Sequence, residues 1–239
     1  MPLVAYIPIT TTVFSIYFFS VIYYHWRQKP DAFYLLWWTI GVVCYGIGTL
    51  VESIHTIYGW SPFIFKAWYI AGAFLGGVPL AQGTIYLLIK RETANKMTIG
   101  LVIILIISAI LVILSPLDVS KVSKKLNGNV LEWSWIRAIT PFINIYALIF
   151  LVGGAFYSAW KYFKAQDFKG RFWGNLFIAI GALLPGIGGT ATKFGYTYVL
   201  YVTELLGILL IYWGYMVIKN DKSLSIHKNQ VTTQEAVNT

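Results

Sequence analysis

The sequence predicts an all-α protein that crosses a membrane seven times, and three observations support this. Hydrophobic residues make up 58% of the 239 residues and charged residues only 11%, a composition typical of polytopic membrane proteins. The charges fall in short clusters between apolar stretches that approach the ~20 residues needed to cross a bilayer. Tryptophans lie near the ends of these stretches, as an interfacial belt requires. The predicted spans are residues 4–24, 33–57, 62–89, 97–114, 133–162, 172–189 and 196–218.

The seven spans form one predicted bundle over residues 1–218 and leave room for little else. The first span lacks a basic leader and a cleavage site, so we expect it to be retained. The longest connection, 115–132, contains Asn127-Gly128-Asn129, a turn signal that is compatible with a small hairpin. The tail 219–239 is polar and lacks periodicity, which predicts disorder.

The net charge of +9 does not indicate a nucleic-acid partner, because the basic residues lie at the ends of spans and there determine orientation. The connections after the odd-numbered spans hold Arg27, Lys29, Lys90, Arg91, Lys96, Lys161, Lys164, Lys169, Arg171, Lys219, Lys222 and Lys228. The other side holds only Lys66, Lys121, Lys124, Lys125, Arg137 and Lys193. We therefore expect a cytoplasmic carboxyl terminus, an external amino terminus and the inner (plasma) membrane as location. Cys44, the single cysteine, excludes a disulfide framework.

A parallel internal repeat is predicted from matches that recur in the same order. Ile40-Gly41 and Gly46-Ile47-Gly48 of span two match Ile180-Gly181 and Gly186-Ile187-Gly188 of span six. The ends of spans one and three similarly match those of spans five and seven. Residues 1–92 would then form one repeat and 133–218 the other, with 97–114 as a linker helix, a 3+1+3 layout.

Two acids are the strongest candidate site residues. Glu52 and Glu204 lie ~8 and ~12 Å inside the outer ends of their helices at 1.5 Å per residue, and a lone carboxylate in hydrocarbon must find a proton or a partner. His55, one helical turn from Glu52, and Arg137 lie toward the same end. We expect these residues to line a polar cavity that is open to the outside.

The alternative is that Glu52 forms an ion pair with Lys66 or Arg137 and only fastens helix ends, and both interpretations stay open. Tyr69 and Tyr201 are candidate ligand-binding residues, although aromatic side chains at helical spacing more often serve packing. One Glu-x-x-His pair, Glu52 and His55, is too little for a metal centre. We therefore expect no metal, no cofactor and no hydrolase chemistry.

Glycine and proline predict flexible points in two spans. Pro79 in span three and Pro185 with Gly186 in span six are candidate hinges, because proline removes a backbone donor. A broken helix at the outer end of span six would expose backbone groups to the cavity. Gln82 and Asn144 are expected to form hydrogen bonds between helices.

Spans two and three resemble the seven-helix membrane module of some bacterial sensor histidine kinases, through Trp37, Glu52, Trp68-Tyr69, Gly72 and Pro79. In that family a signalling domain follows the last span, so the resemblance implies a separate cytoplasmic signalling partner for this chain. The 3+1+3 layout also resembles the broad set that includes SWEET transporters and microbial rhodopsins. Retinal attachment is excluded because no lysine lies between Lys193 and Lys219, and the paired Pro-Gln signature of PQ-loop transporters is missing.

Three functions follow from these observations. The first is a sensor or receptor-like protein that binds a small ligand in the outer cavity and signals through a partner. The second is a small-molecule or proton-coupled transporter that uses Glu52 or Glu204 as the coupling acid. The third is a lipid- or isoprenoid-modifying enzyme, which is disfavoured because no nucleophile–base pair can be assembled.

Overall fold

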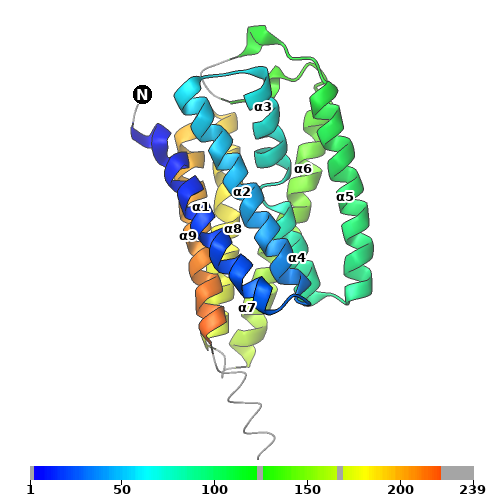
Figure 1. Ribbon diagram of the computed structural model, residues 1–239, viewed down its shortest axis with the longest axis vertical. Helices are drawn as coiled ribbons and strands as arrows, with labels where there is room; N and C mark the ends of the chain where they lie inside the picture. Colours follow the sequence, from blue (N-terminus) through cyan, green and yellow to red (C-terminus); the bar gives the residue numbers. More distant parts are fainter. Residues whose placement is uncertain (1–2, 123–125, 166–168, 222–239) are drawn as a thin grey trace, which may run out of the picture.

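Seven helices that are long and apolar enough to cross a membrane run alternately up and down the molecule (Figure 1). They lie in the part of the chain that the computed structural model describes, residues 3–122, 126–165 and 169–221. The spans are Leu3–Gln28, Phe33–Tyr58, Pro62–Leu88, Arg91–Leu114, Ile136–Lys164, Lys169–Thr192 and Thr197–Asn220. The prediction of an all-α protein with seven spans is confirmed. The predicted disorder of the tail concerns residues that lie almost wholly outside the described part.

Five of the spans consist mainly of one α-helix each, and two are composite. The single helices are α1 (Ile7–Gln28, after the 3₁₀ turn Leu3–Tyr6), α2 (Phe33–Tyr58), α5 (Arg91–Leu114), α8 (Lys169–Lys193) and α9 (Thr197–Asn220). Span three comprises α3 (Pro62–Trp68), the π-helix η2 (Tyr69–Phe74) and α4 (Val78–Leu88). Span five comprises α6 (Ile136–Ala147), the π-helix η5 (Leu148–Gly153) and α7 (Gly154–Lys164). Two short 3₁₀ helices, Val119–Lys121 and Gly128–Val130, lie in the loop between α5 and α6, which we call the outer loop after the side predicted for it.

Helix α5 begins at Arg91, six residues earlier than its apolar stretch predicts. Its polar first turns are helical because they find partners. Lys96 pairs with Glu92 one turn away at 2.8 Å. The Gln82 amide of α4 donates to the Ala94 carbonyl at 3.2 Å and to Thr98 at 2.7 Å. The Gln82 carbonyl accepts from Tyr146 of α6, which confirms the interhelical role expected for Gln82, whereas Asn144 lies exposed on α6.

Span three is interrupted at residues 75–77, immediately before α4. Pro79 stands in the first turn of α4, where its missing N–H costs no helical hydrogen bond. Gly76 and Gly77 precede it, and glycine weakens a helix. The chain therefore restarts its helix here rather than kinking through the proline.

The expected break at the outer end of span six is wrong, because α8 continues through Pro185 and Gly186 to Lys193. Proline deprives the carbonyl four residues earlier, that of Gly181, of its helical donor. That carbonyl lies against α9, since a Cβ added at Gly207 would stand 2.7 Å from it. We infer that this close packing keeps α8 continuous despite the proline.

Glycines seven residues apart set the contact between α8 and α9. Gly181 faces Gly207, Gly174 faces Gly214, and Gly188 faces Leu200. The pairs are antiparallel and in register, and such small residues allow two backbones to approach closely. In the first half of the chain, Gly41 of α2 faces Leu80 and Gly48 faces Gly72. The internal repeat stays a prediction.

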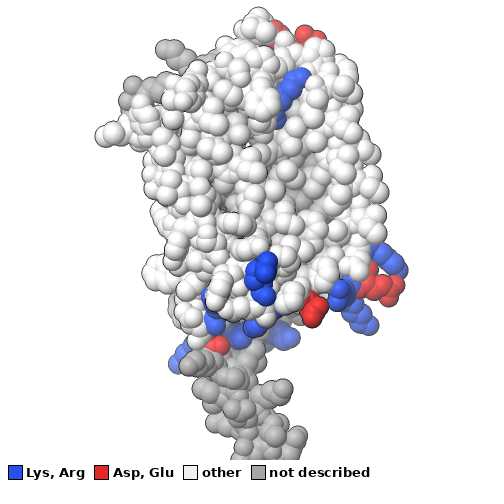
Figure 2. Space-filling view, viewed as in Figure 1, with Lys and Arg blue, Asp and Glu red and all other residues white. Residues whose placement is uncertain are grey.

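Two apolar clusters form the core. One is made by α1, α2, α4, α7, α8 and α9 around residues such as Phe18, Val42 and Ile208. The other packs Phe65, Phe74 and Ile136 beneath the outer loop. That loop closes through an isolated antiparallel bridge between Leu117 and Leu131, so of the expected hairpin only this bridge is present among the described residues. Lys and Arg gather at the opposite end (Figure 2).

Candidate functional site

The carboxyl groups of Glu52 on α2 and Glu204 on α9 lie close enough to interact directly with each other. Glu52 is 3% exposed, and the Oε2 atoms of both residues are buried. Among the described residues these Oε2 atoms meet no N–H or hydroxyl donor. The structure thus brings the two acids together, as expected from their depth, whereas the polar hollow around them stays a prediction.

Three aromatic residues surround the pair. The Trp68 indole N–H donates to Glu52 Oε1 at 3.0 Å. The Tyr45 hydroxyl donates to the backbone carbonyl of Glu204 at 2.8 Å. Tyr201, on the same face of α9 as Glu204, lies close to Thr56 and within electrostatic range of both carboxyl groups. The site therefore joins α2, α3 and α9.

The closeness of the two carboxyl groups favours a proton bound between them. Two carboxyl groups form a hydrogen bond only when one of them is protonated, because an ionised carboxylate is acceptor-only. Two ionised carboxylates in contact would instead place like charges in a region of low dielectric constant. A hydrogen bond between the two groups would therefore hold one shared proton, which belongs to the pair rather than to either residue. In the described part of the chain no three His, Cys, Asp or Glu side chains converge.

The predicted cationic partners of Glu52 lie elsewhere. Lys66 Nζ donates to the Ile113 carbonyl of α5 at 2.6 Å. Arg137 donates to the Asn129 side chain and, at 3.4 Å, to the Ser134 carbonyl. Between described residues, the salt bridges join Lys96 to Glu92 and Lys121 to Asp118. An ion pair that fastens Glu52 to either cation is therefore absent from this structure.

The remaining predicted residues divide into two groups. His55 is buried on α2, one turn from Glu52. Tyr69 is 4% exposed, shares a hydrogen bond of 2.9 Å with Thr140, and lies with Arg137 near Gly128 of the outer loop. Tyr69 and Arg137 thus belong to the loop, whereas Tyr201 belongs to the carboxyl pair. Of the three candidate hinge residues, Pro185 packs against Gly207 of α9, one turn after Glu204.

Trp68 and Thr56 were not predicted as site residues, although a signal for Trp68 exists. Two antiparallel helices joined by a short turn bring together residues at equal distances from that turn. Glu52 and Trp68 each lie eight residues from position 60, and Gly48 and Gly72, which also face each other, lie twelve. Counting outward from the turn would have paired the acid with its indole donor.

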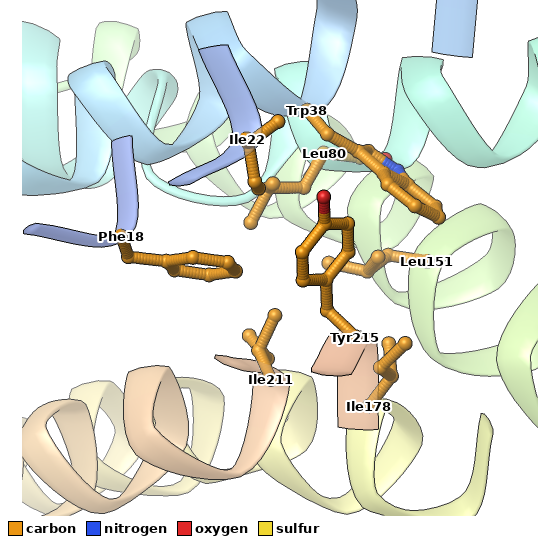
Figure 3. Close-up of a pocket in the computed structure, with 8 residues that line it drawn as sticks. All are labelled: Phe18, Ile22, Trp38, Leu80, Leu151, Ile178, Ile211 and Tyr215. Carbon is orange, nitrogen blue, oxygen red and sulfur yellow. The ribbon is translucent and has the colours of Figure 1, made fainter. Parts of the chain in front are cut away.

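A small cavity lies inside the bundle, apart from the carboxyl pair. Its volume is ≈ 20 Å³, enough for about one water-sized sphere. Figure 3 shows the Tyr215 ring rising from α9 among the lining side chains. The cavity is lined by Phe18, Ile22, Trp38, Leu80, Leu151, Ile178, Ile211 and Tyr215.

In comparisons with known proteins, no protein-family model matches this sequence, and no curated protein or solved structure is significantly similar to it. The resemblance to the sensor-kinase module thus rests on the quoted residues alone. What the observations establish is an integral membrane protein with seven candidate spans and a buried carboxyl pair between the second and the last.

Proposed function

We propose that this chain is a proton-coupled membrane transporter whose working site is the Glu52–Glu204 pair. One observation carries the proposal: the two carboxyl groups, on the second and the last span, lie in direct reach of each other, and a hydrogen bond between them exists only while a proton is bound. Buried acids in membrane spans commonly mark proton relays and coupling sites. In the proposed orientation the amino terminus is external, and the pair lies in the outer half of the inner (plasma) membrane.

Loss of the shared proton would act on the distance between two helices. Both carboxylates would then be charged in a buried site, and their repulsion would favour an arrangement in which α2 and α9 separate and water reaches the pair. Rebinding of a proton would restore the hydrogen bond. Proton occupancy is thereby coupled to helix position, because the free energy of proton binding differs between the two helix arrangements.

Transport is favoured over ligand sensing by the interruption of span three at residues 75–77. Discontinuous helices at membrane depth are a recurring feature of secondary transporters. Trp68, the donor to Glu52, precedes this interruption in the same span. The proposed 3+1+3 repeat would supply two halves, residues 1–92 and 133–218, that rock against each other with one acid on each.

The test is proton flux into liposomes that contain the purified full-length chain and an internal pH-sensitive dye. With the membrane potential clamped, the unmodified chain should acidify the lumen after an external pH drop. Glu204→Gln and Glu52→Gln should reduce this flux to that of protein-free liposomes, because glutamine cannot release a proton. Glu132→Gln, an equivalent change in the exposed outer loop, is the matched control and should leave the flux unchanged. Equal flux in all variants would refute the proposal.

Helix separation can be measured independently. Spin labels at Ile57→Cys and Tyr198→Cys, both exposed positions near the outer ends of α2 and α9, report this distance in a Cys44→Ser background. The distance should increase as the pH is raised, and the Glu52→Gln/Glu204→Gln double variant should abolish this increase. A distance that does not depend on pH would exclude the proposed coupling.

A proton-dependent sensor that signals through a cytoplasmic partner is the second candidate. The observation that favours it is the burial of the pair, since both Oε2 atoms are inaccessible to water. A proton-dependent contact between two helices can transmit a signal without transporting a substrate across the membrane. A pH-dependent distance without proton flux would select this function. Binding of a larger ligand at the pair would require the side chains around it to move apart.

A further inference from the structure

The cavity in Figure 3 lies at the meeting point of six of the seven spans. Its lining comes from α1, α2, α4, α8 and α9 and from the π-helix η5 of span five, and only span four does not contribute. An apolar cavity of this size stays dry. The cavity therefore marks a place where the packing between spans is incomplete and the lining is unfavourable for water.

The two polar side chains that line this space already form hydrogen bonds with other groups. Trp38 donates its indole N–H to the Leu80 carbonyl at 3.2 Å. The Tyr215 hydroxyl is paired with His25 Nδ1 at 2.7 Å. The other six lining side chains are hydrocarbon. Water entering the cavity would thus find almost no hydrogen-bond partner, although it would need two to four.

Helix α9 connects this cavity to the carboxyl pair. Glu204, Ile208, Ile211 and Tyr215 are spaced four, three and four residues apart, so they share one helical face. At 1.5 Å per residue, Ile211 lies ~10 Å and Tyr215 ~16 Å from Glu204 along the axis. The sequence of groups along this face is acid, apolar layer, then the Tyr215–His25 pair.

The inner pair lies where protons can reach water. His25 is half-buried in the last turn of α1, and Lys29 and Lys219 lie close enough to act on its charge. Near Tyr215 lie also the Lys219 ammonium, 6.0 Å from the centre of its ring, and the side chains of Phe18, Tyr34, Trp38 and Tyr212. Both ring nitrogen atoms of histidine can carry a proton, which makes it the usual shuttle residue at neutral pH.

We propose that the cavity is a closed hydrophobic gate in a proton path that leads from the Glu52–Glu204 pair to the His25–Tyr215 pair. This inference rests on the proposed function and adds a route to it. A proton from the outer side binds the carboxyl pair, crosses the apolar layer when water enters the cavity, and leaves through His25 to the inner side. In the closed arrangement the dry layer blocks transfer, because no water chain connects the two pairs.

The test is to make the gate polar. Ile211→Ser places a hydroxyl in the lining, lowers the cost of hydrating the cavity, and should raise proton flux in liposomes by about tenfold, which corresponds to a barrier ~1.4 kcal/mol lower. Ile211→Val keeps the lining apolar, is the matched control, and should leave the flux near that of the unmodified chain. If Ile211→Ser does not fold, Leu151→Ser tests the same layer from span five.

Combined variants decide whether the added flux follows the proposed path. Glu204→Gln or Tyr215→Phe in the Ile211→Ser background should return the flux to the level of protein-free liposomes. Flux that persists in both combinations would identify a nonspecific leak and overturn the path. If both serine variants leave the flux unchanged while Glu204→Gln alone is inactive, the gate is overturned but the proposed function stands. If the Glu204→Gln variant is active, the proposed function itself is refuted.

Discussion

Substitution of Gly181 by alanine tests the account of helix packing most directly. An alanine Cβ at this position would lie 2.7 Å from the Gly207 carbonyl oxygen and 2.9 Å from the Ile211 nitrogen of α9. Ordinary van der Waals contacts of a Cβ begin near 3.4 Å. The facing atoms are backbone and cannot rotate away, so α8 and α9 must separate by several tenths of an ångström.

The expected cost follows from two opposing effects. Overpacking of a close interface costs about 1–3 kcal/mol, while replacing glycine by alanine within a helix returns about 0.5–1 kcal/mol. The net loss should be about 1–2 kcal/mol, which lowers the melting temperature by a few degrees for a chain of this length. The double variant Gly181→Ala/Gly207→Ala should lose less than the sum of the single losses, because one helix separation relieves both contacts.

Thermal unfolding in detergent, followed by tryptophan fluorescence, measures these differences. Gly186→Ala on the same helix is the matched control, because a Cβ there meets nothing within 4 Å. It should leave the melting temperature unchanged or raise it. The reasoning would be refuted if Gly181→Ala were as stable as the unmodified chain, or if Gly186→Ala were destabilised to the same extent.

Three further predictions concern polar groups outside the carboxyl pair. Gln82→Leu should lower the melting temperature, because it leaves the half-buried Tyr146 hydroxyl without its acceptor, at a cost of ~1–3 kcal/mol; Thr98 keeps its bonds to Tyr86 and to the Ala94 carbonyl. Arg137→Gln should leave proton flux unchanged in the liposome assay, since Arg137 contacts the outer loop and not the acids; reduced flux would return it to the site. Asp118→Asn should not alter the pH dependence of the α2–α9 distance between pH 5 and 8. Hydrogen bonds from Lys121 and Ser120 hold the pKa of the Asp118 carboxyl below its usual value, so its stabilising contribution is complete above that value and is lost only as the pH falls through the lowered pKa.

Span positions were predictable because each one depends on local composition. The ends of α2 and α9 fall within about two residues of the expected bounds, since apolar stretches and turn residues define them. The start of α5 was not predictable in the same way. Its polar first turns are held by the Gln82 amide, a tertiary contact that hydropathy does not reveal.

The two acids were predicted to share a site from their depth, but their direct contact was not. Depth along a helix follows from residue counting, whereas the rotation of each helix depends on how it packs. The glycine series of α8 and α9 sets that rotation for the last span, and it becomes visible only when Gly174, Gly181 and Gly188 are read at a spacing of seven. Arg137 and Tyr69 were grouped with the acids because they lie toward the same end, yet they face the outer loop.

Helices α2 and α9 contribute both to the carboxyl pair and to the lining of the cavity. These shared helices connect the two proposals mechanically. Helix α2 carries Glu52 and Trp38, and α9 carries Glu204, Ile211 and Tyr215. Close glycine contacts make α9 move with α8, and Gly41 and Gly48 join α2 to span three. In the proposed mechanism the joint that opens lies between α2 with span three and α8 with α9, and α1, which packs against both α2 and α9, borders it. Opening it at the acids would also move Trp38 and Leu80 away from Ile178 and Ile211, so loss of the shared proton would widen the apolar layer. A spin-label pair across the cavity level should then lengthen at the same pH as the outer pair, and two separate midpoints would show that the acids and the gate are not coupled.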